Sequence, residues 1–206
     1  MKDDRDGLLE RESIAAALTP FVPREIDVGD RRAAAVAIAI GGRPRNRRML
    51  LTKRPSRLRA HPGQFALPGG AIDPGESAVQ GCLRELAEEV GLVASQSDVL
   101  GRLDDYVTRS GYVITPFVIW IGDRLDLVDV NRAEVAAVYE VDVAEIDTDP
   151  RFVSIEQSSR PVVQWPFRDS LVHAPTGAIV HQFREVVLHR RHTRVADFEQ
   201  PVFAWR

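Results

Sequence analysis

The sequence predicts an α/β fold in which a mixed β-sheet lies between helices. Residues 33–40 form a continuous apolar run that includes Val and Ile, which is the pattern of a buried strand. Residues 8–18 and 77–90 instead repeat apolar side chains at the helical period. With 206 residues, 44% of them hydrophobic and 28% charged, the chain is long enough for one sizeable globular domain with its own core.

The N-terminal part of the chain is predicted to be a short appended helix. The sequence LLERESIAAAL at residues 8–18 has helical periodicity, and the proline-containing stretch after it would stop a helix. We therefore expect residues 1–29 to form a helix and a linker that pack on the main domain, residues 30–206.

Strands and one further helix follow in order along the main domain. The strand at 33–40 is expected to pair with an antiparallel partner, and other apolar runs indicate more strands. The predicted strands are the partner at 48–54, two strands within 98–122 around Arg109-Ser110-Gly111 (the second at 112–121), one at 134–141 and one at 160–167. Residues 142–161 are polar and predict a long loop with at most a short helical turn. Residues 175–190 predict a final helix with Ile179, Phe183, Val186 and Val187 on its buried side.

The segment 70–92 is predicted to be a loop, a helix and a second loop. Asp73-Pro74-Gly75 is a turn signal, Ser77 is a suitable N-cap, and Gly91 would end the helix as its C-cap. The apolar stripe consists of Val79, Cys82 or Leu83, Leu86 and Val90.

The same helix carries a concentrated group of acids. Glu85, Glu88 and Glu89 are spaced by three and four residues, so they lie as neighbours on one helix face. Such like charges repel, and a divalent cation would explain their arrangement, because carboxylate oxygens are hard ligands of the kind that Mg²⁺ or Mn²⁺ prefers. Pro68-Gly69-Gly70, which comes before the turn, would let the backbone approach a ligand or metal without a side chain between them.

These residues resemble the signature G-x5-E-x7-R-E-U-x-E-E-x-G-U of the Nudix hydrolases, where U is aliphatic, and all nine specified positions agree. The resemblance implies a Nudix-type α/β/α sandwich and a Mg²⁺-dependent (or Mn²⁺-dependent) hydrolase of a nucleoside diphosphate linked to another group. By position, Glu85, Glu88 and Glu89 resemble the catalytic metal ligands, and the Gly70 carbonyl is a further metal candidate. Glu76 and Arg84 resemble the ion pair that braces the loop, and we count Arg84 among the catalytic residues.

A second resemblance lies just upstream, within a strongly basic stretch. Between residues 31 and 72 the chain has ten Arg or Lys and no acid. The sequence is similar to the motif L-L-T-x-R-[SA]-x3-R-x3-G-x3-F-P-G-G of the coenzyme A pyrophosphatase subgroup, with Pro55 and Leu67 as the two departures. The positions in register are Leu50, Leu51, Thr52, Arg54, Arg59, Gly63, Pro68, Gly69 and Gly70.

This subgroup resemblance implies a substrate and a set of residues that bind it. The substrate would be coenzyme A (CoA) or an acyl-CoA, cleaved to 3',5'-ADP and 4'-phosphopantetheine or its acyl form. Basic side chains suit the extra phosphate of CoA, since Arg grips phosphate through paired hydrogen bonds. The expected substrate-binding residues are Arg54 and Arg59 first, then Arg57 and His61, together with Gly69 and Gly70.

The general base and the substrate both remain open at this stage. Either Glu85 on the helix or a later loop acid could assist the attacking water, and Glu134, Glu145 and Glu156 are the loop candidates for the base. The alternative substrates are other nucleoside diphosphate derivatives such as ADP-ribose, NADH or a nucleoside triphosphate. A catalytically silent module that senses a nucleotide is a rival of another class. An RNA-directed role is disfavoured, because no aromatic residues alternate with the basic ones to stack bases.

Charge and composition disfavour several broader classes of function. A net charge of −3 disfavours a general nucleic-acid or membrane binder. A single cysteine, Cys82, can form no internal disulfide and agrees with a reducing compartment. No run approaches the roughly 18 to 20 apolar residues that span a bilayer, so we expect a cytoplasmic protein. A homodimer is left open.

Overall fold

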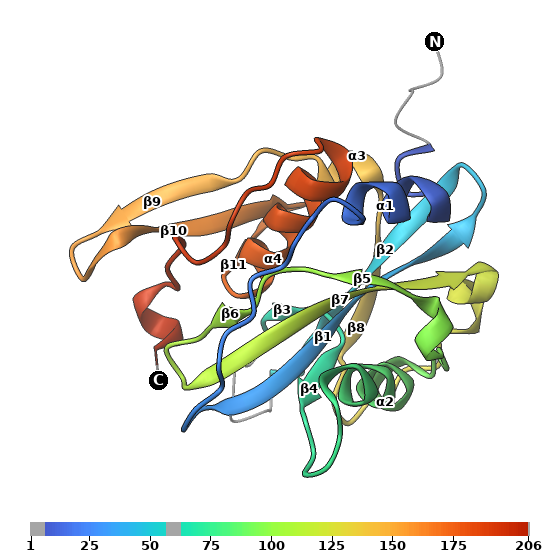
Figure 1. Cartoon of the computed structure of the whole chain (residues 1–206), viewed down its shortest axis with the longest axis horizontal. Helices are drawn as coiled ribbons and strands as arrows, with labels where there is room; N and C mark the ends of the chain where they lie inside the picture. Colours follow the sequence, from blue (N-terminus) through green and yellow to red (C-terminus); the bar gives the residue numbers. More distant parts are fainter. Residues whose placement is uncertain (1–6, 57–62, 206) are drawn as a thin grey trace.

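A mixed β-sheet forms the centre of the computed structural model, which describes residues 7–56 and 63–205 (Figure 1). The central strands run in the order β3–β2–β1–β7–β5, with β4 paired to β1, β6 to β7 and β8 to β2. The strands are β1 (Arg32–Arg43), β2 (Asn46–Lys53), β3 (Phe65–Ala66), β4 (Gly69–Ala71), β5 (Val99–Arg102), β6 (Tyr106–Val107), β7 (Tyr112–Gly122) and β8 (Ala137–Val141). Strands β1 and β7 are parallel, whereas β1 and β2 form an antiparallel hairpin. The predicted mixed sheet is confirmed.

The sequence of β1 explains how one helix comes close to the sheet. Side chains alternate between the two faces of a strand. Ala35, Ala37 and Ala39 are fully buried in the cluster that also contains the apolar stripe of α2 (Ala78–Val90). Because these alanines are small, α2 can lie close to the strands, which places its acids beside β4.

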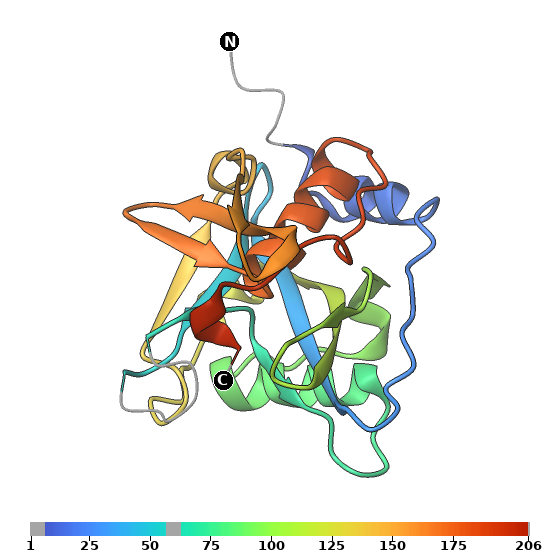
Figure 2. The same ribbon diagram turned by 90° about the vertical axis from the view of Figure 1, so that its left-hand side faces the viewer.

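The opposite face of the sheet is covered by helices and by a second sheet (Figures 1 and 2). Ile38 and Ile40 point to this side, in a core with residues of α1 (Arg11–Leu18) and α4 (Thr176–Phe183). Helices therefore lie on both sides of the sheet, as the predicted α/β/α class requires.

The second sheet corrects the prediction of a long loop at residues 142–161. This region contains α3 (Val143–Ile146), which matches the expected helical turn, and also the strand β9 (Arg151–Ile155). β9 pairs with β10 (Ser158–Phe167), and β10 pairs with β11 (Ser170–His173). Four of the five residues of β9 are exposed, so the strand has no apolar alternation to reveal it. Its backbone pairing with β10 holds it in place.

Other boundaries differ from the prediction by a few residues. The first helix begins at Arg11, and residues 98–122, all of them described, form β5, β6 and β7 where two strands were expected. The final helix is α-helical to Phe183 and continues as a π-helical turn, Arg184–Leu188, which is buried on all sides. The short 3-10 turns are η2 (Gln96–Asp98), η3 (Asp123–Leu127) and η5 (Val202–Ala204).

The described part of the N-terminal segment packs on the main body. Leu9 and Phe21 are buried in the core beside α4. The extended chain that follows is held by side-chain acceptors, since Asp104 accepts from the Arg24 N–H at 2.7 Å and Asp105 from the Ile26 N–H at 2.9 Å. The domain division at residue 30 stays a prediction. Within residues 7–56 and 63–205, no helix combines the length and apolar character needed to cross a bilayer.

Candidate active site

Helix α2 is fixed at both ends by the residues that the sequence indicates. The Ser77 side chain accepts from the Gln80 N–H, and the Gln80 side chain accepts from the Ser77 N–H at 2.8 Å, which together form a capping box. Gly91 ends the helix in the left-handed region, at φ 71°. The predicted helix and both of its caps are confirmed.

The three acids of this helix lie in different environments. Cys82, Leu86 and Val90 are fully buried against the sheet. The side chain of Glu85 is 15% exposed and that of Glu88 is 54% exposed, while Glu89 is 5% exposed as a whole residue. Glu85 and Glu89 therefore belong to a sheltered site, and Glu88 lies at its rim.

Strand β4 brings the backbone of Gly69 and Gly70 against these acids. Glu89 Oε2 accepts from the Gly69 N–H at 3.1 Å. A Cβ on Gly70 would lie 2.5 Å from Glu85 Oε1, so the carboxylate occupies the space that any side chain would need. A Cβ on Gly69 would lie 2.2 Å from the carbonyl oxygen of Ala35 in β1. Close approach of the backbone therefore requires glycine at position 69, whereas an added Cβ at position 70 would displace the Glu85 carboxylate.

Arg84 connects the loop before α2 to the acids. Its Nε and Nη2 donate to Glu76 Oε1 and Oε2 at 2.9 and 3.1 Å, as the expected ion pair requires. Its Nη1 also donates to Glu85 at 2.9 Å and to Glu88 at 2.8 Å. The side-chain hydrogen bond to Glu76 is the largest cause that raises the pKa of Arg84, and the same bond lowers the pKa of Glu76. One guanidinium thus compensates part of the charge of three carboxylates.

The sheltered acids bind protons more readily than ordinary carboxyl groups. Burial raises the pKa of Glu89 to about 7, and the charge of Glu85 adds to this effect. Burial also raises the pKa of Glu85, against the opposing effect of Arg84. Among the described residues, no three His, Cys, Asp or Glu side chains already converge as a metal-binding group. In this conformation Glu85 and Glu88 are turned to Arg84, and Glu89 is turned to the Gly69 amide.

Besides Gly69 and Gly70, the structure brings one basic residue of the predicted substrate-binding set, Arg54, to the acids. The positive charge of Arg54 lowers the pKa of Glu89, so the two side chains are electrostatic neighbours. The Nε of Arg54 is buried and has no hydrogen-bond partner among the described residues. Arg57, Arg59 and His61, which were also predicted to bind substrate, lie outside the described residues.

Comparison with known proteins identifies the family. The NUDIX domain model matches residues 30–166, which is more than half of the chain. The chain belongs to the Nudix family. The uncharacterized Nudix hydrolase NudL of Photorhabdus laumondii is 34% identical over 174 residues, which cover 82% of this chain and 91% of that protein. Nudix hydrolase 3 of Caenorhabditis elegans is 33% identical over 150 residues, covering 70% of this chain and 61% of that protein.

A solved structure agrees with this assignment at the level of the fold. The MutT/nudix family protein of Enterococcus faecalis superposes with a TM-score of 0.50 at 18% identity, covering 84% of this Nudix chain and 63% of that protein.

Of the three loop candidates for the base, Glu134 is the one that lies near the acids of α2. Its charge raises the pKa of both Glu85 and Glu89. The loop that carries it is attached to the end of α2, because Asn131 N–H donates to the Glu89 carbonyl at 3.0 Å. Glu145 instead binds Arg168 at 2.9 Å and accepts from the N–H of Asp142, the N-cap of α3. Glu156 lies in the turn between β9 and β10. Sequence alone could not separate these three acids.

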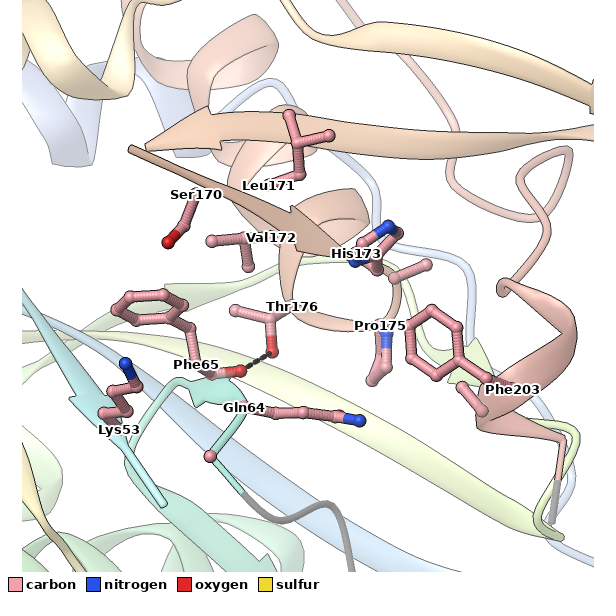
Figure 3. A pocket seen from close by; sticks show the side chains of 13 residues that line it. Lys53, Gln64, Phe65, Ser170, Leu171, Val172, His173, Pro175, Thr176 and Phe203 are labelled. Atoms are coloured by element: carbon pink, nitrogen blue, oxygen red, sulfur yellow. Dashed lines mark hydrogen bonds between the residues drawn. The ribbon is translucent and has the colours of Figure 1, made fainter. Parts of the chain in front are cut away.

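A pocket that the sequence did not reveal lies between the β2–β3 edge and β11, beside α4 (Figure 3). Its volume is about 260 Å³. Its walls include Lys53, Gln64, Phe65, His173, Thr176 and Phe203. These residues come from distant parts of the sequence, and the only earlier signal is that Lys53, Gly63, Gln64 and Phe65 lie within the upstream motif.

Proposed function

We propose that this Nudix hydrolase uses Mg²⁺ or Mn²⁺ to cleave the pyrophosphate of CoA or acyl-CoA. The products would be 3',5'-ADP and 4'-phosphopantetheine or its acyl form. The observation that carries the proposal is the complete Nudix signature, folded so that Glu85 and Glu89 are sheltered against the backbone of Gly69 and Gly70.

The donor groups at this site suit a hard divalent cation. Glu85, Glu88, Glu89 and the Gly70 carbonyl would hold it, and oxygen ligands of this kind are those that Mg²⁺ and Mn²⁺ prefer. A buried Glu89 whose pKa is about 7 is costly to ionise without positive charge nearby, which supports this assignment. For Glu85 and Glu88 to act as ligands, their carboxylates must turn away from Arg84 Nη1, while Arg84 Nε and Nη2 keep their bonds to Glu76.

Residues of this chain would handle the substrate and the proton. A bound cation supplies charge that neutralises phosphoryl oxygens and lowers the pKa of water. Glu134 would accept the proton of the attacking water as its oxygen bonds to phosphorus and the phosphoanhydride bond breaks. Arg54 would bind a phosphate oxygen, since its buried Nε has no partner among the described residues. Arg84 would hold the Gly70–Glu76 loop against α2.

The upstream motif supports CoA as the substrate. Nine of its positions are in register, and the basic stretch that contains it suits a substrate with an additional phosphate. Leu67, where the motif has Phe, is buried at 3% exposure, so this departure from the motif replaces one apolar packing residue with another. Arg59, Arg57 and His61 remain proposed contacts to the 3'-phosphate.

Two alternatives make different predictions. Another nucleoside diphosphate derivative, such as ADP-ribose or NADH, would use the same acids but would not need the basic stretch. A silent nucleotide-binding module would bind without turnover. A module without chemistry would have no need for all three glutamates together with a nearby Glu134, which favours an enzyme.

The proposal is tested by CoA hydrolysis with and without a chelator, in wild type and in Glu89→Gln. We expect turnover that needs Mg²⁺ or Mn²⁺ and that falls by at least 100-fold in Glu89→Gln. Gln keeps the size of Glu and an oxygen that can accept from the Gly69 N–H, so the melting temperature should stay close to wild type. Retained turnover in Glu89→Gln would remove this residue from the site, and CoA left intact by wild type would refute the substrate.

A further inference from the structure

The pocket beside α4 has aromatic rings at both ends. Figure 3 shows Phe203 beside His173 and Pro175 at one end, and Phe65 beside Lys53 at the other. The ring of Phe65 is already engaged, because it packs edge-on against Tyr139 and Phe167 with centroid distances of 5.3 and 5.4 Å. Phe203 is 62% exposed, although it contacts the His173 ring edge-on. An exposed ring at the mouth of a pocket can stack on a flat ligand group.

The lining also carries hydrogen-bonding groups and one cation. Gln64, Ser170, His173 and Thr176 contribute polar side chains. Lys53 Nζ lies 5.1 Å from the centroid of Phe65, and among the described residues it has no carboxylate within ion-pair distance. A cation without an acidic partner favours an anionic ligand. Gln164 bonds His173 Nε2 at 3.1 Å, which fixes the orientation of the imidazole ring.

The pocket is within reach of the acids and is small. Lys53 and Arg54 are consecutive, so their side chains leave the chain in opposite directions, one into the pocket and the other toward Glu89. Phe65 and Gly69 are four residues apart, so the two sites are separated by at most about 14 Å of extended chain. A volume of about 260 Å³ lies below the usual range for a whole drug-sized ligand, so it fits one end of a long substrate.

We propose that this pocket binds the phosphorylated nucleoside end of the substrate, with the base stacked on Phe203 and a phosphate bound by Lys53. Its role as a substrate subsite rests on the proposed function, whereas nucleotide binding itself does not. The alternative occupant is the flexible amide chain of phosphopantetheine. This chain has no flat ring to stack on Phe203 and no charge to pair with Lys53, so it would use both groups less fully than a nucleotide would. The aromatic ring and the cation therefore favour the nucleotide.

The test measures binding of two products by calorimetry without metal, with the full-length chain. The ligands are adenosine 3',5'-bisphosphate and 4'-phosphopantetheine, and the variants are Phe203→Ala, Phe203→Trp and Lys53→Met. We expect Phe203→Ala to weaken binding of the bisphosphate about 10-fold or more, and Phe203→Trp to retain it. Lys53→Met should weaken the bisphosphate about 10-fold, with little effect on unphosphorylated adenosine.

Matched controls separate the pocket from general effects. Val202→Ala removes an exposed apolar side chain from the same turn as Phe203 but outside the pocket, and Arg43→Met removes an exposed cation elsewhere. Both controls should bind the bisphosphate as wild type does. The inference is overturned if wild type does not bind the bisphosphate, if the pocket variants bind it like wild type, or if they lose phosphopantetheine instead.

The outcomes also distinguish this inference from the proposed function. If the pocket variants lose the nucleotide but wild type hydrolyses no nucleoside diphosphate derivative, the pocket inference stands and the proposed function fails. If wild type cleaves CoA but the pocket variants bind the bisphosphate unchanged, the proposed function stands and the pocket inference fails.

Discussion

Gly70→Ala should abolish most of the activity while leaving the fold intact. The new Cβ would lie 2.5 Å from Glu85 Oε1 and 2.6 Å from its Cδ. An ordinary contact of about 3.5 Å requires the carboxylate to retreat by about 1 Å. Because the carboxylate is the end of a flexible side chain, this retreat should change the free energy of unfolding by less than about 1 kcal/mol. Misplacement of a catalytic group by that distance lowers turnover about 100-fold.

The assay compares kcat/KM at saturating Mg²⁺ with thermal unfolding followed by circular dichroism. Two other glycines serve as controls. Gly69→Ala would place a Cβ 2.2 Å from the Ala35 carbonyl and 2.6 Å from the Val36 Cα, both rigid backbone atoms, and should destabilise the fold by about 3 kcal/mol or more. Gly7→Ala meets no atom within 4 Å and should behave as wild type. Wild-type kcat/KM in Gly70→Ala would show that the position of Glu85 against β4 does not matter.

Three further predictions follow from the structure. Glu134→Gln should lower kcat/KM by about 100-fold or more with little change in stability, whereas Glu145→Gln and Glu156→Gln should keep kcat/KM; equal losses in all three would remove Glu134 as the base. Burial alone would raise the pKa of Glu199, but hydrogen bonds from Arg109, Gln200 and Arg160 lower it to about 2. The ionised carboxylate therefore contributes fully to the free energy of unfolding above about pH 5, and this contribution is lost as the pH falls toward 2. That contribution is at most about 3 kcal/mol, because Arg109 and Arg160 are partly exposed. Urea unfolding at pH 7 and pH 3 should show that Glu199→Gln loses less unfolding free energy between the two pH values than wild type does. An equal loss in both proteins would contradict the assignment. Burial raises the pKa of the Cys82 thiol to about 12, so iodoacetamide at pH 8 should modify it only after unfolding, and rapid labelling of folded protein would show that the thiol is accessible.

The parts of the fold that could be predicted are those with local signals. The caps of α2, Ser77 and Gly91, and the apolar run of β1 each depend on residues that are close in sequence. β9 could not be predicted, because most of its residues are exposed and its pairing with β10 is set by the second sheet.

The candidate site shows the same division. The sequence spacing predicted that the three glutamates lie on one face of a helix, but it gave no reason to expect different environments for them. Glu85 and Glu89 are sheltered against β4, whereas Glu88 is exposed. This difference in burial depends on the tertiary contact between α2 and the sheet. The pocket could not be predicted from the sequence, since Lys53 and Phe203 line it together although they are far apart along the chain.

The choice of substrate by the wild-type protein is the decisive test of the proposed function. Purified protein with Mg²⁺ would be given CoA, acetyl-CoA, ADP-ribose, NADH and a nucleoside triphosphate, and the products would be identified by mass. We predict the highest kcat/KM for the CoA species, with 3',5'-ADP and phosphopantetheine as the products. Preferred cleavage of another substrate would contradict the assignment of CoA while keeping the Nudix chemistry, and no cleavage of any of them would make the protein a silent nucleotide-binding module.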